Sequence, residues 1–384
     1  MAAELGPRVG FIGAGQLARM SAAPAAALGI DFAVLANSSD EPAALVSSNV
    51  TVGSKDDPDT VVAFARTCDV VTFDHELVTP EVMAALTESG IPFYPSASAL
   101  VYAQDKLAMR QALTERGIPC PAWKHVTSEA DALAFAEQIG YPFILKTSRG
   151  GYDGRGVWTI ESATELADVL QTPLPANGEW LAEELVPFTR ELSAQIARSP
   201  GNQCVAYPVV QTTQRNGICA EVISPAPDLD PRRAEQAQEI ALRIAQELDV
   251  VGMVAVELFD TGTEIVVNEL AMRPHNSGHW SIEGAVTSQF ENHLRAVLDL
   301  PLGSPRATGE WSVMGNILGG DVGDLYSAYR HVFARDPGLH VHLYGKEVKP
   351  GRKVGHVTAV GSDLSDLRGR VGHATDYFSG VINE

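Results

Sequence analysis

The sequence is poor in cysteine and in basic residues. Four cysteines occur among 384 residues, and no two of them have CxxC spacing. No disulfide framework is indicated, and reduced thiols in a cytoplasmic protein are the simplest expectation. The 28 lysines and arginines face 48 aspartates and glutamates, which gives a net charge of −20. We therefore expect neither nucleic acid nor an anionic membrane as a partner, because both attract basic surfaces.

Long apolar runs are absent as well. No stretch reaches about 18 uninterrupted apolar residues, the length that a membrane-spanning helix needs. Residues 1–13 lack the basic segment and apolar run of a signal peptide. The composition, 45% hydrophobic and 20% charged, is ordinary for a globular enzyme. The length predicts two or three domains.

The N-terminal part predicts a parallel α/β sheet, because short apolar strands alternate with helical segments. These strands are 9–12, 32–35, 50–52 and 70–73. The first runs into GAGQLA (13–18), a turn of the dinucleotide-binding type. Such a fold needs an acidic residue after the second strand, where Ala36 and Asn37 stand instead. A dinucleotide site is therefore disfavoured, and a helix N-terminus that faces an anion is the remaining functional interpretation.

Asp74, His75 and Glu76 directly follow the last of these strands. Open α/β sheets bind ligands at the carboxyl ends of their strands. The three residues are candidates for ligand contacts, and a polar strand exit without a ligand is the alternative.

Residues 140–160, GYPFILKTSRGGYDGRGVWTI, predict a strand, a glycine-rich loop and a second strand. Lys146 stands near the end of the first strand. The four loop glycines leave backbone N–H groups accessible to a phosphate chain, and Arg155 can hold an anion bidentately. No GK[ST] sequence or helix follows, so this is not a Walker loop. A flexible hairpin tip is the alternative.

Helix-capping signals occur at four places in the middle of the chain. The predicted helices are 105–116, 129–139, 162–170 and one that begins at Asp230-Pro231.

The stretch Glu183-Glu184-Leu185-Val186 follows an apolar strand and is suited to bind an adenine. An adenine needs hydrogen bonds from the backbone on its edge and apolar contacts on its faces. A surface strand end is the alternative.

Strands 250–259 and 264–270 form a predicted hairpin that carries Glu257, Asn268 and Glu269. Two carboxylates on adjacent strands are costly to bury unless a cation offsets them. Carboxylate and amide oxygens suit Mg²⁺ held together with substrate phosphates. The sequence therefore favours a magnesium site over an exposed polar pair.

Two later stretches are dense in polar groups. In RPHNSGHW (273–280), His275 and His279 raise the question of zinc, but Pro274 and Gly278 break helical continuity and no cysteine or HExxH motif accompanies them. The run KEVKPGRKVGH (346–356) is rich in basic residues within an acidic chain, which favours an anion site over a solvated turn.

Taken together, these stretches resemble the ATP-grasp superfamily. More narrowly, the chain resembles the N5-carboxyaminoimidazole ribonucleotide synthetase family. The matching stretches are GAGQLARM, TFDHE, GGYDGRG, NELAMRPHNSGHW, SQFENHLRA and KEVKPGRKVGH, which span nearly the whole chain. The resemblance implies an α/β (α+β) ATP-grasp fold: an N-terminal parallel α/β domain (1–103), a central ATP-grasp domain (104–299) and a small β-rich C-terminal domain (300–384).

The resemblance also implies a reaction. Bicarbonate would be joined to the exocyclic amine of 5-aminoimidazole ribonucleotide in purine biosynthesis, through carboxyphosphate, while ATP becomes ADP and phosphate. ATP and Mg²⁺ are the implied cofactors, and the implied assembly is a homodimer. A sister ligase such as formate-dependent glycinamide ribonucleotide transformylase is the alternative, but it lacks the HNSGHW and PGRKVGH pair. An oxidoreductase built on GAGQLA is opposed by the missing acid.

Residue roles carried over from the family fall into four groups. Those for ATP are Lys106, Lys146, Arg149, Gly150, Gly151, Tyr152, Asp153, Gly154, Arg155, Glu183, Glu184, Leu185, Val186, Glu191, Gln214, Asn268 and Glu269. Those for the ribonucleotide are Gln16, Leu17, Glu76, Asn276, Ser277, Lys346, Arg352 and Lys353. The implied metal ligands are Glu257, Glu269 and Asn268, and the implied catalytic residues are Tyr152, Asp153 and Arg155.

Two positions depart from the family pattern. Lys106 stands where arginine is usual, and Gln214 stands where a histidine often contacts ATP. Lysine loses the bidentate fork of arginine, and glutamine carries no charge. Both changes bear on nucleotide affinity more than on the type of reaction.

Overall fold

The computed structural model describes residues 6–151, 154–320 and 322–383. Its N-terminal unit is a five-stranded parallel sheet in the order β3-β2-β1-β4-β5. The strands are β1 (Arg8–Ile12), β2 (Asp31–Ala36), β3 (Asn49–Val52), β4 (Val70–Phe73) and β5 (Phe93–Tyr94). The helices of this unit are α1 (Gln16–Ala27), α2 (Pro58–Ala65), α3 (Pro80–Ser89) and α4 (Ala97–Gln104). The predicted parallel α/β unit is confirmed.

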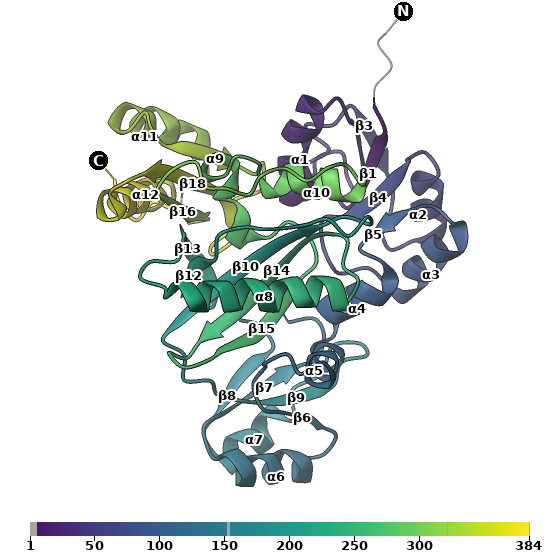
Figure 1. Cartoon of the computed structure of the whole chain (residues 1–384), viewed down its shortest axis with the longest axis vertical. Helices are drawn as coiled ribbons and strands as arrows, with labels where there is room; N and C mark the ends of the chain where they lie inside the picture. Colours follow the sequence, from purple (N-terminus) through teal and green to yellow (C-terminus); the bar gives the residue numbers. More distant parts are fainter. Residues whose placement is uncertain (1–5, 152–153, 321, 384) are drawn as a thin grey trace, which may run out of the picture.

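A small four-stranded antiparallel sheet, in the order β6-β9-β7-β8, forms the lower lobe in Figure 1. Helix α5 (Lys106–Glu115) precedes it. The lobe contains β6 (Trp123–Val126), α6 (Glu129–Ile139), β7 (Phe143–Thr147), β8 (Val157–Ile160), α7 (Ala163–Val169) and β9 (Trp180–Glu184). The core of this lobe includes Phe143 and Leu145 of β7 and Trp180 of β9, together with residues of α6 and α7. The predicted strand–loop–strand at 140–160 is therefore β7, the glycine-rich loop and β8.

The largest sheet is antiparallel, in the order β15-β14-β10-β12-β13-β16-β18-β17, with β11 paired to β10. Its strands are β10 (Arg190–Arg198), β11 (Cys204–Ala206), β12 (Val210–Arg215), β13 (Ile218–Ser224), β14 (Gly252–Asp260), β15 (Ile265–Ala271), β16 (Trp311–Leu318), β17 (His340–Leu343) and β18 (Lys353–Gly361). The associated helices are α8 (Pro231–Glu247), α9 (Ser281–Gly284), α10 (Gln289–Val297), α11 (Tyr329–Arg335) and α12 (Leu364–Phe378), with 3₁₀ turns at Asn276–Gly278 and Leu325–Ala328.

The strands after residue 300 are not a separate sheet, because β16 pairs with β13 and extends the central one. Helix α12 then packs against β16 and β18 through an apolar core that includes Leu367, Val371 and Phe378. The boundaries proposed at 103/104 and 299/300 stay predictions.

His293 joins the N-terminal unit to the central sheet. Its Nδ1 accepts a hydrogen bond from the backbone N–H of Met253, 3.1 Å away, so its proton is on Nε2, 2.9 Å from the hydroxyl of Thr72. Burial lowers the pKa of His293 to about 3, which keeps the ring neutral. Within the described residues, no helix combines the length and the apolar character that crossing a bilayer requires.

Candidate active site

Lys146 lies between the small lobe and the central sheet. It leaves β7 toward Glu183 on β9, with 2.7 Å between Nζ and Oε2, and its Nζ is 3.4 Å from Oδ1 of Asn268 on β15. Arg110 of α5 completes the group, with its Nε 2.6 Å from the other carboxylate oxygen of Glu183. Lys146 is thus held from both sides, by a carboxylate of the small sheet and an amide of the central sheet.

Glu183 is almost fully buried at 2% exposure. Burial alone would favour its neutral form, but the charges of Arg110 and Lys146 outweigh burial and hold its pKa well below the usual range. The carboxylate was predicted at the adenine hinge, and the structure places it beneath Lys146. The rest of the hinge begins at Glu184, the last residue of β9, whose N–H donates to the carbonyl of Ala122 at 2.9 Å, and continues to Val186.

Glu257 and Glu269 are cross-strand partners on β14 and β15. Burial, followed by the charge of Glu269, raises the pKa of Glu257 to about 7. Glu269 instead pairs with Lys106, 2.8 Å away, and this lysine lowers the pKa of Glu269 against the effect of burial. Lys106 thus offsets the charge of Glu269, while Arg273 and Lys353 lie near Glu257.

His275 lies beside this pair, with 3.5 Å between its Nε2 and Oε1 of Glu257. Its Nδ1 accepts the backbone N–H of Ser277, so the ring proton is on Nε2 and faces Glu257. The Ser277 hydroxyl is buried and lies 2.8 Å from three side-chain atoms, on His275, Ser193 and Gln195. Its hydroxyl thus lies among these three side chains, and the predicted role of Ser277 in substrate binding stays a prediction.

The zinc alternative gains no support from the geometry. His279 is fully buried and its Nδ1 lies 3.0 Å from the amide nitrogen of Gln289. Among the described residues, no three or more His, Cys, Asp and Glu side chains are arranged to hold a metal ion.

The glycine-rich loop extends from the small lobe across the cleft. A Cβ at Gly154 would lie 3.4 Å from Cα of Gly217, in the turn between β12 and β13 of the central sheet. Gly150, Gly154 and Gly156 have left-handed backbone conformations, with φ of 76°, 77° and 72°. Arg155 is exposed at this end of the loop. Tyr152 and Asp153 lie outside the described residues.

The base of the loop is joined to α5. Arg149 donates from Nε and Nη2 to Oδ2 of Asp105, at 3.0 and 2.9 Å. Asp105 also caps α5 by accepting the N–H groups of residues 107 and 108. The N–H of Lys106 donates to the carbonyl of Ser148 at 2.8 Å, so the loop and Lys106 are positioned together. Gly151 cannot take a side chain, since its Cβ would lie 2.8 Å from the carbonyl oxygen of residue 155.

Glu191 and Gln214 are neighbours in the central sheet. A hydrogen bond from Gln214 holds the carboxylate of Glu191, whose pKa burial nevertheless raises. The glutamine that departs from the family pattern therefore contacts the residue predicted to take the ribose.

The N-terminal unit contributes an acidic edge. Asp74 is buried and accepts the backbone N–H of Gly15, and a Cβ at Gly13 would collide with its carboxylate. Burial raises the pKa of Asp74 to about 6. The anion that faces the N-terminus of α1 is therefore this side chain, and Gln16 and Leu17 follow directly, half-buried and buried.

Glu76 connects this edge to the central sheet. It accepts the N–H of Met272 at 3.1 Å and the Nε of Arg273 at 2.7 Å. Arg273 and Lys353 both add positive charge next to Glu257. Three parts of the chain thus meet at Glu257: the end of β4, the segment after β15 and the start of β18.

The basic run 346–356 supplies two cations to this junction. Lys346 adds positive charge next to Asp74 and His279 and lies over the ring of Tyr344, with 6.0 Å between Nζ and the ring centroid. Half-buried Lys353 acts on Glu257 and His275. Arg352 is exposed and donates to the carbonyl of Glu347 at 3.3 Å. Asn276, whose side-chain nitrogen is buried, completes the predicted substrate residues.

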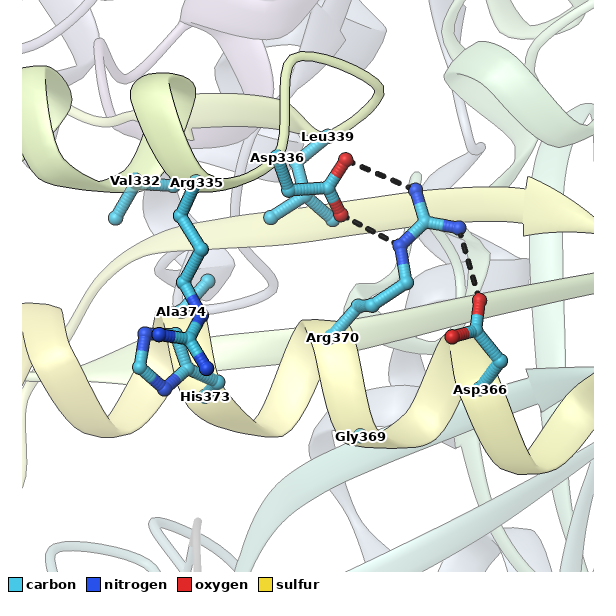
Figure 2. Close-up of a pocket in the computed structure, with 9 residues that line it drawn as sticks. All are labelled: Val332, Arg335, Asp336, Leu339, Asp366, Gly369, Arg370, His373 and Ala374. Atoms are coloured by element: carbon cyan, nitrogen blue, oxygen red, sulfur yellow. Dashed lines mark hydrogen bonds and ion pairs between the residues drawn. The ribbon is translucent and has the colours of Figure 1, made fainter.

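A cavity of about 510 Å³ lies elsewhere, between α11 and α12 (Figure 2). Its charged groups are already paired, because Arg370 binds Asp336 through both oxygens, at 2.5 and 3.1 Å, and Asp366 at 3.2 Å. Figure 2 shows Arg335 lying beside His373 on the other side of the cavity. This cavity is separate from the residues predicted for nucleotide and substrate.

Comparisons with known proteins now decide the family. Family models match residues 7–104 (ribonucleotide synthetase preATP-grasp domain), 111–290 (ATP-grasp domain) and 312–370 (phosphoribosylaminoimidazole carboxylase C-terminal domain). N5-carboxyaminoimidazole ribonucleotide synthase of Mycobacterium tuberculosis is 48% identical over 379 residues, which cover 98% of this chain and 88% of that protein. The chain belongs to the N5-carboxyaminoimidazole ribonucleotide synthase family.

Solved structures of this synthase family agree. A carboxyaminoimidazole ribonucleotide synthase from Aspergillus clavatus in complex with ATP has a TM-score of 0.88 and 32% identity, over 98% of this chain and 99% of that one. The Aspergillus clavatus enzyme with ADP and 5-aminoimidazole ribonucleotide also has a TM-score of 0.88, with 32% identity over 97% of this chain and 99% of that one. The predicted ATP-grasp ligase fold and ATP binding are thereby confirmed.

Three residues that lie beside the predicted site residues, Arg110, Arg273 and His275, were not assigned to the site from the sequence. Arg110 and Arg273 carry no motif of their own, although Arg273 stands inside RPHNSGHW. His275 was weighed only as a zinc ligand. The available signal for Arg273 and His275 was their position directly after the predicted metal strand.

Proposed function

We propose that this chain carboxylates 5-aminoimidazole ribonucleotide with bicarbonate, converting ATP to ADP and phosphate in purine biosynthesis. The observation that carries the proposal is the junction at Glu257. Arg273 and Lys353 add positive charge next to Glu257, and Lys106 and Lys146 add it next to Glu269, the cross-strand partner of Glu257. A nucleotide and a phosphorylated substrate could thus bind at adjacent sites, on either side of Glu257 and Glu269. A homodimer in the cytoplasm is part of the same proposal.

ATP is assigned to the cleft between the small lobe and the central sheet. Its adenine would contact Glu184 to Val186, and its ribose would contact Glu191 with Gln214 beside it. Lys106, Lys146 and Arg149 would bind the phosphates beneath the glycine-rich loop. This assignment is supported by the loop glycines and by the fixed position of Lys146.

Magnesium is assigned to Glu257, Glu269 and Asn268. The fit rests on the adjacent, partly exposed carboxylates of Glu257 and Glu269, where burial and the charge of Glu269 raise the pKa of Glu257. Oxygen donors of this kind suit Mg²⁺ shared with phosphate groups. When bound, the ion would neutralise the negative charge of the transferred phosphoryl group.

The ribonucleotide is assigned to the side of the junction that faces the N-terminal unit. Lys346, Arg352 and Lys353 would bind its 5′-phosphate. The remaining contacts would come from Gln16, Leu17, Glu76, Asn276 and Ser277. Positive charge that clusters in an acidic protein supports this half of the site.

The chemistry follows in two steps. An oxygen of bicarbonate attacks the γ-phosphorus of ATP, ADP leaves, and carboxyphosphate forms. The exocyclic amine then attacks the carboxyl carbon, the C–O bond to phosphate breaks, and the leaving phosphate takes the bridging oxygen together with the amine proton. Tyr152, Asp153 and Arg155 are assigned to hold the intermediate, and a closed loop would exclude water from it.

Product analysis tests the proposal directly. ADP, phosphate and carboxylated ribonucleotide should form in equal amounts only when bicarbonate and 5-aminoimidazole ribonucleotide are both present. Formate with glycinamide ribonucleotide is the control pair for the sister ligase. ADP formation that depends on this control pair, and not on bicarbonate, would overturn the proposal.

A further inference from the structure

Arg110 is the most deeply buried charged residue next to the nucleotide cleft. Its exposed fraction is 0%, and it lies on α5. The guanidinium has two different partners. Its Nε is 2.6 Å from Oε1 of Glu183, and its Nη2 donates to the main-chain carbonyl of Asn268 at 2.8 Å. One side chain therefore contacts β9 of the small lobe and β15 of the central sheet.

The two contacts of Arg110 lead to opposite walls of the cleft. Glu183 uses its second oxygen to bind Lys146, while Asn268 stands next to Glu269 on the strand with the acidic pair. The side chain of Asn268 also lies 3.4 Å from Lys146. Arg110, Glu183, Lys146 and Asn268 thus form a closed ring of contacts. This ring contains Lys146, which we assign to the phosphates, and part of β15, which we assign to the metal.

The charges in this group explain why an arginine is needed. Without Arg110, the buried carboxylate of Glu183 would be neutralised by Lys146 alone. With Arg110 present, the three groups carry one net positive charge, and it belongs to Lys146 at the cleft surface. Lysine would not serve equally well at position 110, because an ammonium lacks the planar fork that reaches a carboxylate and a carbonyl at once.

We propose that Arg110 is a positioning residue for ATP: it neutralises Glu183 so that the charge of Lys146 is available to the phosphates, and it fixes the spacing between the two walls. It acts through Lys146 and Asn268 without touching the nucleotide. The inference rests on ATP binding in this cleft and not on the identity of the substrate that becomes carboxylated.

The test is a calorimetric titration of the full-length protein with the non-hydrolysable analogue AMP-PNP in the presence of Mg²⁺. Arg110→Lys should raise the dissociation constant about tenfold or more, the effect expected when a charged hydrogen bond is lost. In steady-state assays at saturating ATP, the KM for the ribonucleotide should change by less than about twofold. This split separates a positioning role from a general loss of structure.

Arg198 provides a matched control. It is also buried, at 6% exposure, and it is the last residue of β10, where it donates to the carbonyl of Val250 and to the side chains of Asn202 and Asp249. Arg198→Lys should lower the melting temperature by an amount similar to Arg110→Lys and leave the affinity for AMP-PNP unchanged. Equal affinity of wild type and Arg110→Lys, with only the melting temperature reduced, would overturn the proposal.

Glu183→Gln decides the matter if Arg110→Lys does not fold. Its neutral amide leaves the charge of Lys146 to the phosphates without help from Arg110, so its affinity for AMP-PNP should not fall. Where both single variants fold, Arg110→Lys should lose less affinity in the Glu183→Gln background than in wild type, because the carboxylate that Arg110 neutralises is gone. An affinity reduced about tenfold in Glu183→Gln would overturn the proposal. If wild type binds AMP-PNP but forms no carboxylated product, the proposed function fails while the role of Arg110 stands.

Discussion

The Nζ of Lys106 lies 2.8 Å from Oε1 of Glu269. This lysine occupies the first position of α5, and Glu269 is the cross-strand partner of Glu257. Lys106 thus offsets part of the negative charge of Glu269, a carboxylate that we assign as a ligand of magnesium. Metal and nucleotide would draw the two residues apart, since Lys106 is also expected at the ATP phosphates.

Removing this lysine should strengthen metal binding in the absence of nucleotide. We expect Lys106→Gln to bind Mn²⁺, a spectroscopic substitute for Mg²⁺, about three- to fivefold more tightly, the size expected for a partly exposed ion pair. ATP binding should weaken in the same variant. Electron paramagnetic resonance of free Mn²⁺ measures the first effect.

The exposed Lys124 on β6 supplies the control, and Lys124→Gln should leave Mn²⁺ binding unchanged. Glu269→Gln should lose Mn²⁺ binding and turnover while keeping the fold. Equal Mn²⁺ affinity in Lys106→Gln and wild type would show that Lys106 does not compete for this carboxylate.

Substitutions in the basic run 346–356 should change the KM for the ribonucleotide and leave the KM for ATP nearly unchanged. Lys353→Ala, which removes a half-buried cation next to Glu257, should raise the KM for the ribonucleotide about tenfold or more, from the loss of one charged hydrogen bond. Arg352→Ala should act in the same direction. The KM for ATP should stay nearly constant in both.

Arg368→Ala is a suitable comparison, because this exposed arginine pairs with Glu221 on the outer side of the sheet. It should leave both KM values unchanged. Equal increases of the two KM values in Lys353→Ala would mean that the phosphate of the ribonucleotide is bound elsewhere.

Arg155 should serve the reaction more than the binding of ATP. Attack of bicarbonate spreads negative charge over the transferred phosphoryl group, which a planar guanidinium matches and an ammonium does not. Arg155→Lys and Arg155→Ala should retain ATP affinity, lose most of kcat and hydrolyse ATP without matching carboxylation. Measuring ADP and carboxylated product on one preparation tests this, and tight coupling with normal kcat in Arg155→Ala would refute it.

Asp74 should make stability depend on pH. Burial raises its pKa from 3.8 to about 6, so the folded protein holds this proton more tightly than the unfolded chain does. Stability should therefore fall as the pH rises from about 4 to about 6, by up to roughly 3 kcal/mol. Asp74→Asn keeps an acceptor for Gly15 and should be more stable than wild type at pH 7.5 but not at pH 4.

Urea unfolding at the two pH values measures this difference, with the exposed Asp40→Asn as the control. A less stable Asp74→Asn at pH 7.5 would show that nearby cations outweigh the burial of this carboxylate.

Local patterns predicted most of the fold. The alternation of strands and helices gave the parallel sheet, and the capping residues Asp105, Ser128, Ser162 and Asp230 stand directly before helices. Strand pairing over long distances was not predictable, so the continuation of the central sheet through β16 could not be foreseen.

The partners of the site side chains could not be predicted from the sequence, because they come from distant parts of the chain. Glu183 stood where an adenine hinge was expected, yet its carboxylate is committed to Arg110, 73 positions earlier in the chain. Ser277 stood in a substrate motif, yet its hydroxyl is shared among His275, Ser193 and Gln195. A motif indicates that a segment lies at the site, but the direction of each side chain depends on partners that only the fold brings near.

The central claim is that bicarbonate is activated by transfer of the γ-phosphoryl group of ATP to one of its oxygens. The most direct measurement uses ¹⁸O-labelled bicarbonate with ATP and 5-aminoimidazole ribonucleotide, followed by ³¹P NMR of the phosphate released. The account predicts that each phosphate carries one ¹⁸O atom from bicarbonate, because the amine displaces phosphate at the carboxyl carbon. Phosphate without label, formed alongside carboxylated product, would contradict it.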